Sequence, residues 1–174
     1  RTQTSGDRKK YTLSTWFKPI PGKDFLFIQA PLSGGYPNSG LSCQADGKLR
    51  FSTADTTAGG SPTNNFITAN SLNEITWYHV VCSVDLTSSD NRCKIYVNGT
   101  EQAFSTAVPS SDVDSELNAD GVVVALGQTS NSVYSDGYLS SFFWVDGQAL
   151  PATTFGNNYE GKWGPLDSAR VITN

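Results

Sequence analysis

The sequence has little charge, a single histidine, no methionine and no long apolar run. Charged residues make up 16% of its 174 residues, and the net charge is −4 at pH 7. Such a chain is a poor partner for nucleic acid, because phosphate binding needs clustered cations. No apolar stretch approaches the roughly 18 residues of a membrane span, and no signal peptide is visible. Since methionine is absent even at position 1, we expect the chain to be processed or cut from a longer polypeptide.

What the sequence does contain is typical of one folded, turn-rich domain. Hydrophobic residues account for 37% of the chain and aromatic residues for 11%, which is enough for a sizeable core. The length fits a single domain over residues 1–174. Abundant Ser, Thr and Asn, 16 glycines and few helix formers favour an all-β protein.

Apolar residues alternate with polar ones, or form short runs between turn residues, along most of the chain. This pattern predicts strands over residues 11–18, 25–30, 41–45, 48–52, 77–85, 91–98, 121–127 and 137–145. Two-residue hairpin turns are expected at Asp46-Gly47, Asn98-Gly99 and Asp146-Gly147, because these residue types tolerate positive φ. A short helical turn is expected over residues 151–155, between a proline and a glycine.

The strands over residues 77–85 and 91–98 form the clearest predicted hairpin. If the hairpin is symmetric about Thr87 and Ser88, Cys82 lies directly opposite Cys93. Opposed Cβ atoms lie about 4.5–5.5 Å apart, which is close enough for a disulfide after small adjustments. The alternative is that the two cysteines are small apolar side chains packed side by side in the core.

The two faces of this hairpin differ in character. One face carries apolar side chains and predicts core: Tyr78, Val80, Cys82, Cys93, Ile95 and Val97. The other face mixes aromatic and polar side chains: Trp77, His79, Val81, Lys94, Tyr96 and Asn98. A mixed face of this kind is typical of a partly covered or ligand-facing side of a sandwich.

Several motifs occur in a fixed order: YTLSTWFK, WYHVVCSVD, KIYVNG, DGYLSSFFWVDGQAL and, after FG, GKWGP. This set, from Tyr11 to Pro165, resembles the laminin G-like jelly roll of the concanavalin A-like lectin/glucanase superfamily. More narrowly, it is similar to the version found in structural proteins of tailed bacteriophages, particularly marine ones. The resemblance implies a two-sheet antiparallel jelly-roll sandwich. Family members usually carry one more strand before the segment that corresponds to residues 1–10, and often more chain after the Trp163 region. The resemblance therefore implies that a longer polypeptide was trimmed to this domain.

The superfamily includes glucanases, whose retaining chemistry needs two carboxylates about 5–5.5 Å apart. Residues two apart on a strand share a face, so such enzymes cluster acids along one strand. The glutamates of this chain instead fall in or near predicted turns and edges: Glu74, Glu101, Glu116 and Glu160. The single histidine, His79, has aromatic neighbours, which favour a packed, hydrogen-bonded ring over a catalytic base. We therefore expect a protein without catalytic residues or an organic cofactor.

Laminin G-like and pentraxin-like relatives often bind Ca²⁺ at a loop rim, through carboxylate and carbonyl oxygens. The candidate for such a site is the acidic stretch 112–120, with Asp112, Asp114 and Glu116 as ligands. This stretch is not an EF-hand, because Leu117 stands where that motif requires glycine. The alternative is a solvated acidic loop that improves solubility.

Sugar sites combine an aromatic ring with planar polar groups that bind hydroxyls. Two predicted loops, 33–38 and 128–136, supply such residues: Tyr36, Asn38, Asn131, Tyr134 and Asp136. These residues form one site only if the two loops meet at one rim. Asp136 also matches the DGYL motif of the family, where it can equally fix the start of a strand. Ordinary turn composition explains the same residues without a ligand.

The resemblance and the lack of catalytic residues together predict a non-catalytic virion domain, in a capsid decoration or a tail fibre. Its expected partners are other virion structural proteins or surface glycans, and its expected location is the virion surface. The alternative is a carbohydrate-binding or adhesion module of a secreted enzyme or receptor, which is extracellular. A catalytic domain or signal peptide on the parent gene favours the alternative, whereas neighbouring capsid or tail genes favour the virion.

Overall fold

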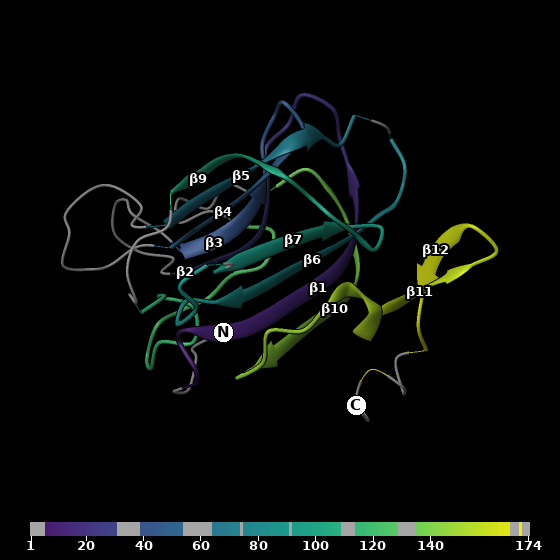
Figure 1. Cartoon of the computed structure of the whole chain (residues 1–174). Helices are drawn as coiled ribbons and strands as arrows, with labels where there is room; N and C mark the ends of the chain where they lie inside the picture. The colour runs from purple at the N-terminus through teal and green to yellow at the C-terminus, as the bar shows by residue number, and fades with distance from the viewer. Residues whose placement is uncertain are drawn as a thin grey trace.

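The structure is a computed structural model that describes residues 6–30, 39–53, 64–73, 75–90, 92–108, 114–128, 135–167 and 171. These residues form two five-stranded antiparallel sheets and a separate two-stranded hairpin (Figure 1). The strands are β1 (Lys10–Pro19), β2 (Phe25–Ala30), β3 (Ser39–Cys43), β4 (Lys48–Thr53), β5 (Asn64–Ser71), β6 (Tyr78–Asp85), β7 (Cys93–Val97), β8 (Thr100–Glu101), β9 (Phe104–Val108), β10 (Gly137–Asp146), β11 (Gly156–Tyr159) and β12 (Lys162–Pro165). A 3₁₀ turn, η1 (Ala152–Thr154), precedes β11. No helix in the described ranges is long and apolar enough to cross a membrane.

The two large sheets pack face to face, which confirms the predicted all-β sandwich. The first sheet has the order β10-β1-β6-β7-β8, and the second has the order β2-β3-β4-β5-β9. Three phenylalanine rings join them, because Phe17 of β1 lies 4.7 Å from Phe25 and 4.6 Å from Phe27 of β2, centroid to centroid. We call the side of the first sheet that meets this core its inner face, and the opposite side its outer face.

The central strands of the first sheet are buried on both faces. All residues from Tyr11 to Thr15 in β1 are buried, and so are all those from His79 to Val84 in β6. The outer face is covered by the segment that follows β10, with Ala152 and Phe155 packed on Val81. This double burial explains the apolar character of β1 and β6, and it confirms the prediction of a partly covered outer face.

A β-bulge in β10 sets which of its side chains face outward. Ser14 pairs with Phe143 but Trp16 pairs with Ser140, so β10 carries one extra residue there. Ser141 absorbs it with a φ of 50°. The alternation restarts after the bulge, so that Phe142 packs on the core between the sheets and Phe143 packs on the outer cluster.

The predicted strand over residues 121–127 is wrong. The segment is irregular, and it runs beside the edge of the second sheet, where the Gly127 N–H donates to the Leu26 carbonyl. Val122 and Val124 pack against the core, whereas Val123 is exposed. The apolar alternation therefore reflects real burial, but positive φ values at Gly121 and Gly127 interrupt the extended backbone.

The predicted register of the β6–β7 hairpin is wrong by two residues. Cys82 pairs with Ile95, and Val84 pairs with Cys93. The cause is the Asp85 carboxylate, which accepts hydrogen bonds from the backbone and hydroxyl of Thr87 and starts the turn there. A shift of two preserves the predicted faces, because side chains alternate with period two.

The two cysteines are packed side by side as free thiols. Their Sγ atoms lie 3.8 Å apart, well beyond the roughly 2.05 Å of a disulfide bond. The third cysteine, Cys43, is also free and buried. The structure therefore has the packed-thiol arrangement, with the sulfur atoms in diagonal contact instead of directly opposed.

We predict that the folded protein resists alkylation. Burial raises the pKa of Cys43 to about 12 and holds the pKa of Cys93 well above its usual range, so little reactive thiolate exists at pH 8. Iodoacetamide followed by mass spectrometry should modify no cysteine in the native protein and three in the denatured protein. One modified cysteine in the denatured, unreduced chain would instead show a bridge between Cys82 and Cys93.

Candidate functional site

The part of the outer face that the C-terminal segment leaves open carries a row of large side chains. Lys18 of β1 pairs with Tyr138 of β10. On its other side, Phe17 pairs with Tyr78, which brings Trp77 to the position beside Lys18. We call Tyr138, Lys18 and Trp77 the aromatic row. Strand spacing puts its two aromatic residues about 10 Å apart, on either side of Lys18.

The aromatic row is exposed to solvent. Trp77 is 42% exposed and Tyr138 is 59% exposed. The Lys18 ammonium lies 5.9 Å from the centre of the Tyr138 ring, within cation–π distance. Ile20 and Ile75 are exposed at the same end of the sheet, where β1 ends and β6 begins. An exposed apolar cluster of this kind typically marks an interaction surface.

Trp163 of β12 forms the boundary between the covered and open parts of the outer face. Its indole N–H donates a 2.9 Å hydrogen bond to Nδ1 of His79, and the two rings stack with centroids 5.9 Å apart. Trp16 stacks on the same imidazole at 5.1 Å. The indole fits because Gly99 has no side chain, since a Cβ there would lie 2.3 Å from a ring carbon of Trp163.

His79 also contacts Ser14, and the pair has the separation of a nucleophile and its base. The distance from Ser14 Oγ to His79 Nε2 is 2.9 Å. The indole N–H can only donate, so Nδ1 is an acceptor and the ring proton sits on Nε2. Nε2 therefore donates to Ser14 and cannot take its proton, which is the step a general base performs.

Burial also keeps this pair from contact with a substrate. Ser14 and His79 are each 1% exposed, so no substrate reaches either side chain. Desolvation lowers the pKa of His79 to about 4, which keeps the ring neutral at physiological pH. The predicted packed, hydrogen-bonded histidine is confirmed.

Of the residues predicted for a sugar site, the structure describes Asp136 alone. Asp136 is exposed and lies two residues before Tyr138 of the aromatic row. The others lie outside the described residues: Tyr36, Asn38, Asn131 and Tyr134. Their joint site stays a prediction.

The described residues that flank the two predicted sugar loops lie at opposite ends of β2. Leu26, near the start of the strand, hydrogen-bonds to Gly127, which precedes the predicted loop over 128–136, and to the Ser135 hydroxyl near the end of that loop. The predicted loop over 33–38 follows β2, which ends at Ala30. Four residues of extended strand separate the two places by about 13 Å. Either loop must span that distance for the two to share one rim.

The acidic stretch is tied to the N-terminal segment by ion pairs. Asp114 pairs with Arg8 at 3.2 Å and with Lys9 at 3.6 Å, and Glu116 pairs with Arg8 at 3.7 Å. Arg8 thus stands between the two carboxylates, where a cation would bind. No group of three or more potential metal ligands occurs in the described ranges. The two described carboxylates do not fit a Ca²⁺ site, and calcium binding that involves Asp112, outside the described residues, stays a prediction.

Comparison with known proteins agrees with the architecture. The family model of the concanavalin A-like lectin/glucanases superfamily matches residues 2–154. No curated protein sequence matches the chain. A heptameric SAP-like pentraxin from Limulus polyphemus is 17% identical with a TM-score of 0.51, over 82% of this chain and 66% of the pentraxin. A sialidase from Trypanosoma rangeli is 18% identical with a TM-score of 0.50, over 84% of this chain. The chain spans only 22% of the sialidase, and at these identities the likeness concerns the fold alone.

Gly99→Ala is expected to displace Trp163. The new Cβ would overlap the indole, and a φ of +79° adds backbone strain, so we expect a loss of about 2–4 kcal/mol in the free energy of unfolding. Gly147→Ala is the matched control, because Gly147 has a φ of +73° but no atom within 4 Å of the new Cβ. It should cost only about 1 kcal/mol. Urea unfolding measures both variants, and equal losses would contradict the close packing of the Trp163 indole on Gly99.

The stability of the protein is expected to fall between pH 6.5 and pH 4. The pKa of His79 is lowered from 6.5 to about 4 in the folded state, so the unfolded chain binds the proton first as the pH falls. The stabilisation is full above pH 6.5, and about 3 kcal/mol is lost by pH 4. Urea unfolding at several pH values should show this slope in the parent chain and a flatter one in His79→Gln. If the stability of both proteins changed equally with pH, groups other than His79 would cause the pH dependence.

Proposed function

Since the chain belongs to the concanavalin A-like lectin/glucanase superfamily, we propose that it is a non-catalytic binding module that recognises a glycan. The observation that carries the proposal is the aromatic row on the open part of the outer face. Two exposed aromatic rings flank a lysine on a rigid sheet. Rings of this kind stack on the apolar face of a sugar, and the ammonium donates to its oxygens.

The chemistry of the described residues supports binding without catalysis. The one serine–histidine pair is buried and has the wrong tautomer for general-base chemistry. The described acidic stretch is neutralised by Arg8 and Lys9. The family description names both lectins and glucanases, and these two classes share carbohydrate as a ligand.

A glycan accounts for the aromatic row better than a purely apolar protein partner does. The polar groups interspersed with the rings are the Lys18 ammonium and the Ser140 hydroxyl, both on the outer face by their registers with Tyr138 and Trp16. A sugar ring likewise presents hydroxyls and apolar patches close to one another. A protein partner would need continuous apolar area to offset the desolvation of Lys18.

The virion is the proposed setting for this binding. The sequence motifs resemble those of bacteriophage structural proteins, which supports a role on a capsid or tail that contacts surface glycans or neighbouring virion proteins. Mass spectrometry of purified virions tests this setting. Absence of the polypeptide from the particle would favour the alternative, an adhesion module of a secreted enzyme or receptor.

Loss of either aromatic side chain should weaken glycan binding. We expect Trp77→Ala and Tyr138→Ala each to reduce affinity by roughly 3–10-fold, because a stacked ring contributes about 0.5–1.5 kcal/mol. A glycan array identifies the ligand, and titration calorimetry measures the variants. Tyr159→Ala is the matched control, since Tyr159 is 49% exposed on β11 and lies outside the aromatic row. Equal losses in all three variants, or no array binding with or without Ca²⁺, would contradict the proposal.

A further inference from the structure

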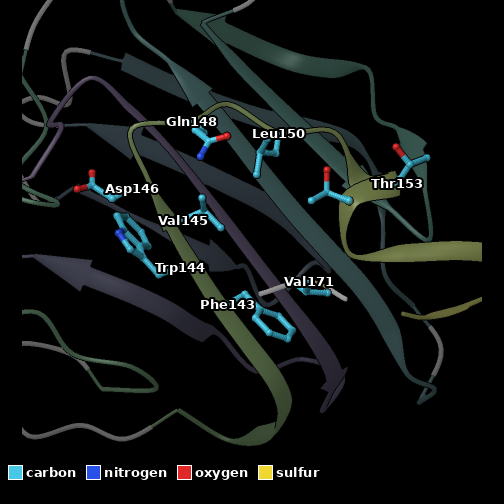
Figure 2. Close-up of a pocket in the computed structure, with 9 residues that line it drawn as sticks. Phe143, Trp144, Val145, Asp146, Gln148, Leu150, Thr153 and Val171 are labelled. Atoms are coloured by element: carbon cyan, nitrogen blue, oxygen red, sulfur yellow. The ribbon is translucent and has the colours of Figure 1, made fainter. Parts of the chain in front are cut away.

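A hollow lies at the other end of β10 from the aromatic row (Figure 2). It forms where β10 ends and the chain turns toward η1, and Val171 contributes to its wall. Its volume is about 620 Å³, which falls within the range of about 300–1,000 Å³ that is usual for small-molecule sites. Neither the family match nor the proposed glycan surface assigns a role to it.

One wall of the hollow is apolar. Phe143, Val145, Leu150 and Val171 all belong to the cluster that covers the outer face. Figure 2 shows Phe143 and Val171 together at one end of the hollow. Each of these side chains is only partly buried by the rest of the described chain. The wall therefore offers apolar surface that a ligand can cover.

The hollow also has polar groups that are available to a ligand. Gln148, Thr153 and Thr154 line the hollow. None of these three side chains hydrogen-bonds to another residue in the described ranges. Together they offer one carboxamide and two hydroxyls with unused donors and acceptors.

The backbone of Gln148 and Leu150 is held by a single threonine. The Thr12 hydroxyl donates to the Gln148 carbonyl at 2.7 Å and accepts from the Leu150 N–H at 2.8 Å. Thr12 is itself fully buried in β1. The segment between Gln148 and Leu150 is thus held in one conformation while the Gln148 side chain stays free. Preorganisation of this kind lowers the entropic cost of binding.

The charge of the hollow restricts the ligand class. Asp146 is the one charged residue among the described residues that line it. Its Oδ1 accepts hydrogen bonds from the Asp7 N–H at 2.8 Å and from the Asn118 side chain at 2.7 Å, which fixes the orientation of the carboxylate. By its register with Tyr11, however, Asp146 projects to the inner face of β10, whereas Val145 projects to the outer face (Figure 2). No charged side chain among the described lining residues therefore faces a ligand on the outer side, and desolvation disfavours a charged ligand there.

We infer that this hollow binds a single uncharged sugar residue, as a second site separate from the aromatic row. The apolar wall would pack against the C–H face of the ring. Gln148, Thr153 and Thr154 would hydrogen-bond to its hydroxyls. The inference extends the proposed glycan recognition but does not require the aromatic row to bind anything.

The test is a titration of the ¹⁵N-labelled domain with methyl β-D-glucopyranoside, methyl β-D-galactopyranoside and methyl β-D-glucuronide, each up to about 50 mM, followed by amide NMR. A neutral glycoside should give saturable shifts at residues 148–154 with a Kd of roughly 1–10 mM. The glucuronide carries a carboxylate in place of the C6 hydroxymethyl group of the glucoside. It should bind at least about fivefold more weakly, because no cation among the described lining residues offsets the desolvation of that carboxylate. Gln148→Ala and Thr153→Val should each weaken binding by about fivefold or more.

Two control variants separate this site from the aromatic row. Thr100→Val makes the same chemical change at an exposed threonine in β8, and it should leave the titration unchanged. Tyr138→Ala should also leave it unchanged, whatever it does to glycan binding at the row. Lack of saturable shifts at residues 148–154 with both neutral glycosides would overturn the inference while leaving the proposed function standing. Equal binding of the glucuronide, or insensitivity to both pocket substitutions, would overturn it as well.

Discussion

The hydrogen bond from the Trp163 indole to the buried His79 ring determines how the outer face of the first sheet is divided. On one side of this contact, Ala152 and Phe155 cover Val81, so β1 and β6 are buried on both faces. On the other side the face is open and carries the aromatic row. Both proposed binding surfaces depend on this division. The aromatic row is exposed because the segment that follows β10 covers the outer face only as far as Trp163. The hollow forms because the same segment does not fully cover the edge strand β10.

Seven strands follow from the sequence, because side-chain alternation records burial: β1, β2, β3, β4, β6, β7 and β10. The other strands of the described chain were not predicted: β5, β8, β9, β11 and β12. The β6–β7 hairpin illustrates the limit of this reasoning. Its faces are predicted correctly, yet its register is wrong by two residues. The alternation of apolar and polar side chains has a period of two, so a register shift of two residues leaves the pattern unchanged. The Asp85 turn that fixes the register uses hydrogen bonds that alternation does not encode. The bulge at Ser141 is hidden for a similar reason, since the run FFWV is apolar in either alignment.

Only part of the candidate site could be predicted from the sequence. Trp77 is correctly predicted on the mixed, partly covered face of the sheet, next to His79 and Val81. Its neighbours Lys18 and Tyr138 come from strands more than fifty residues away in sequence on either side, and only the pairing of β1 with β6 and β10 joins them. The hollow is harder to predict still, because the position of Gln148 in its lining depends on a hydrogen bond from Thr12 in a distant strand. Such long-range contacts leave no local periodic signal.

The separation of the two proposed surfaces bears on what the domain can recognise. Tyr138 and Val145 lie seven residues apart on β10, a distance of about 20 Å. A single sugar ring cannot occupy both places, whereas a polysaccharide or a dense glycan coat can. Two weak contacts joined through one ligand gain strongly in avidity, because the second contact forms at high effective concentration. With only 16% of residues charged, long-range attraction adds little to this binding. Discrimination would then rest on contact geometry, and would favour repetitive surfaces over free oligosaccharides.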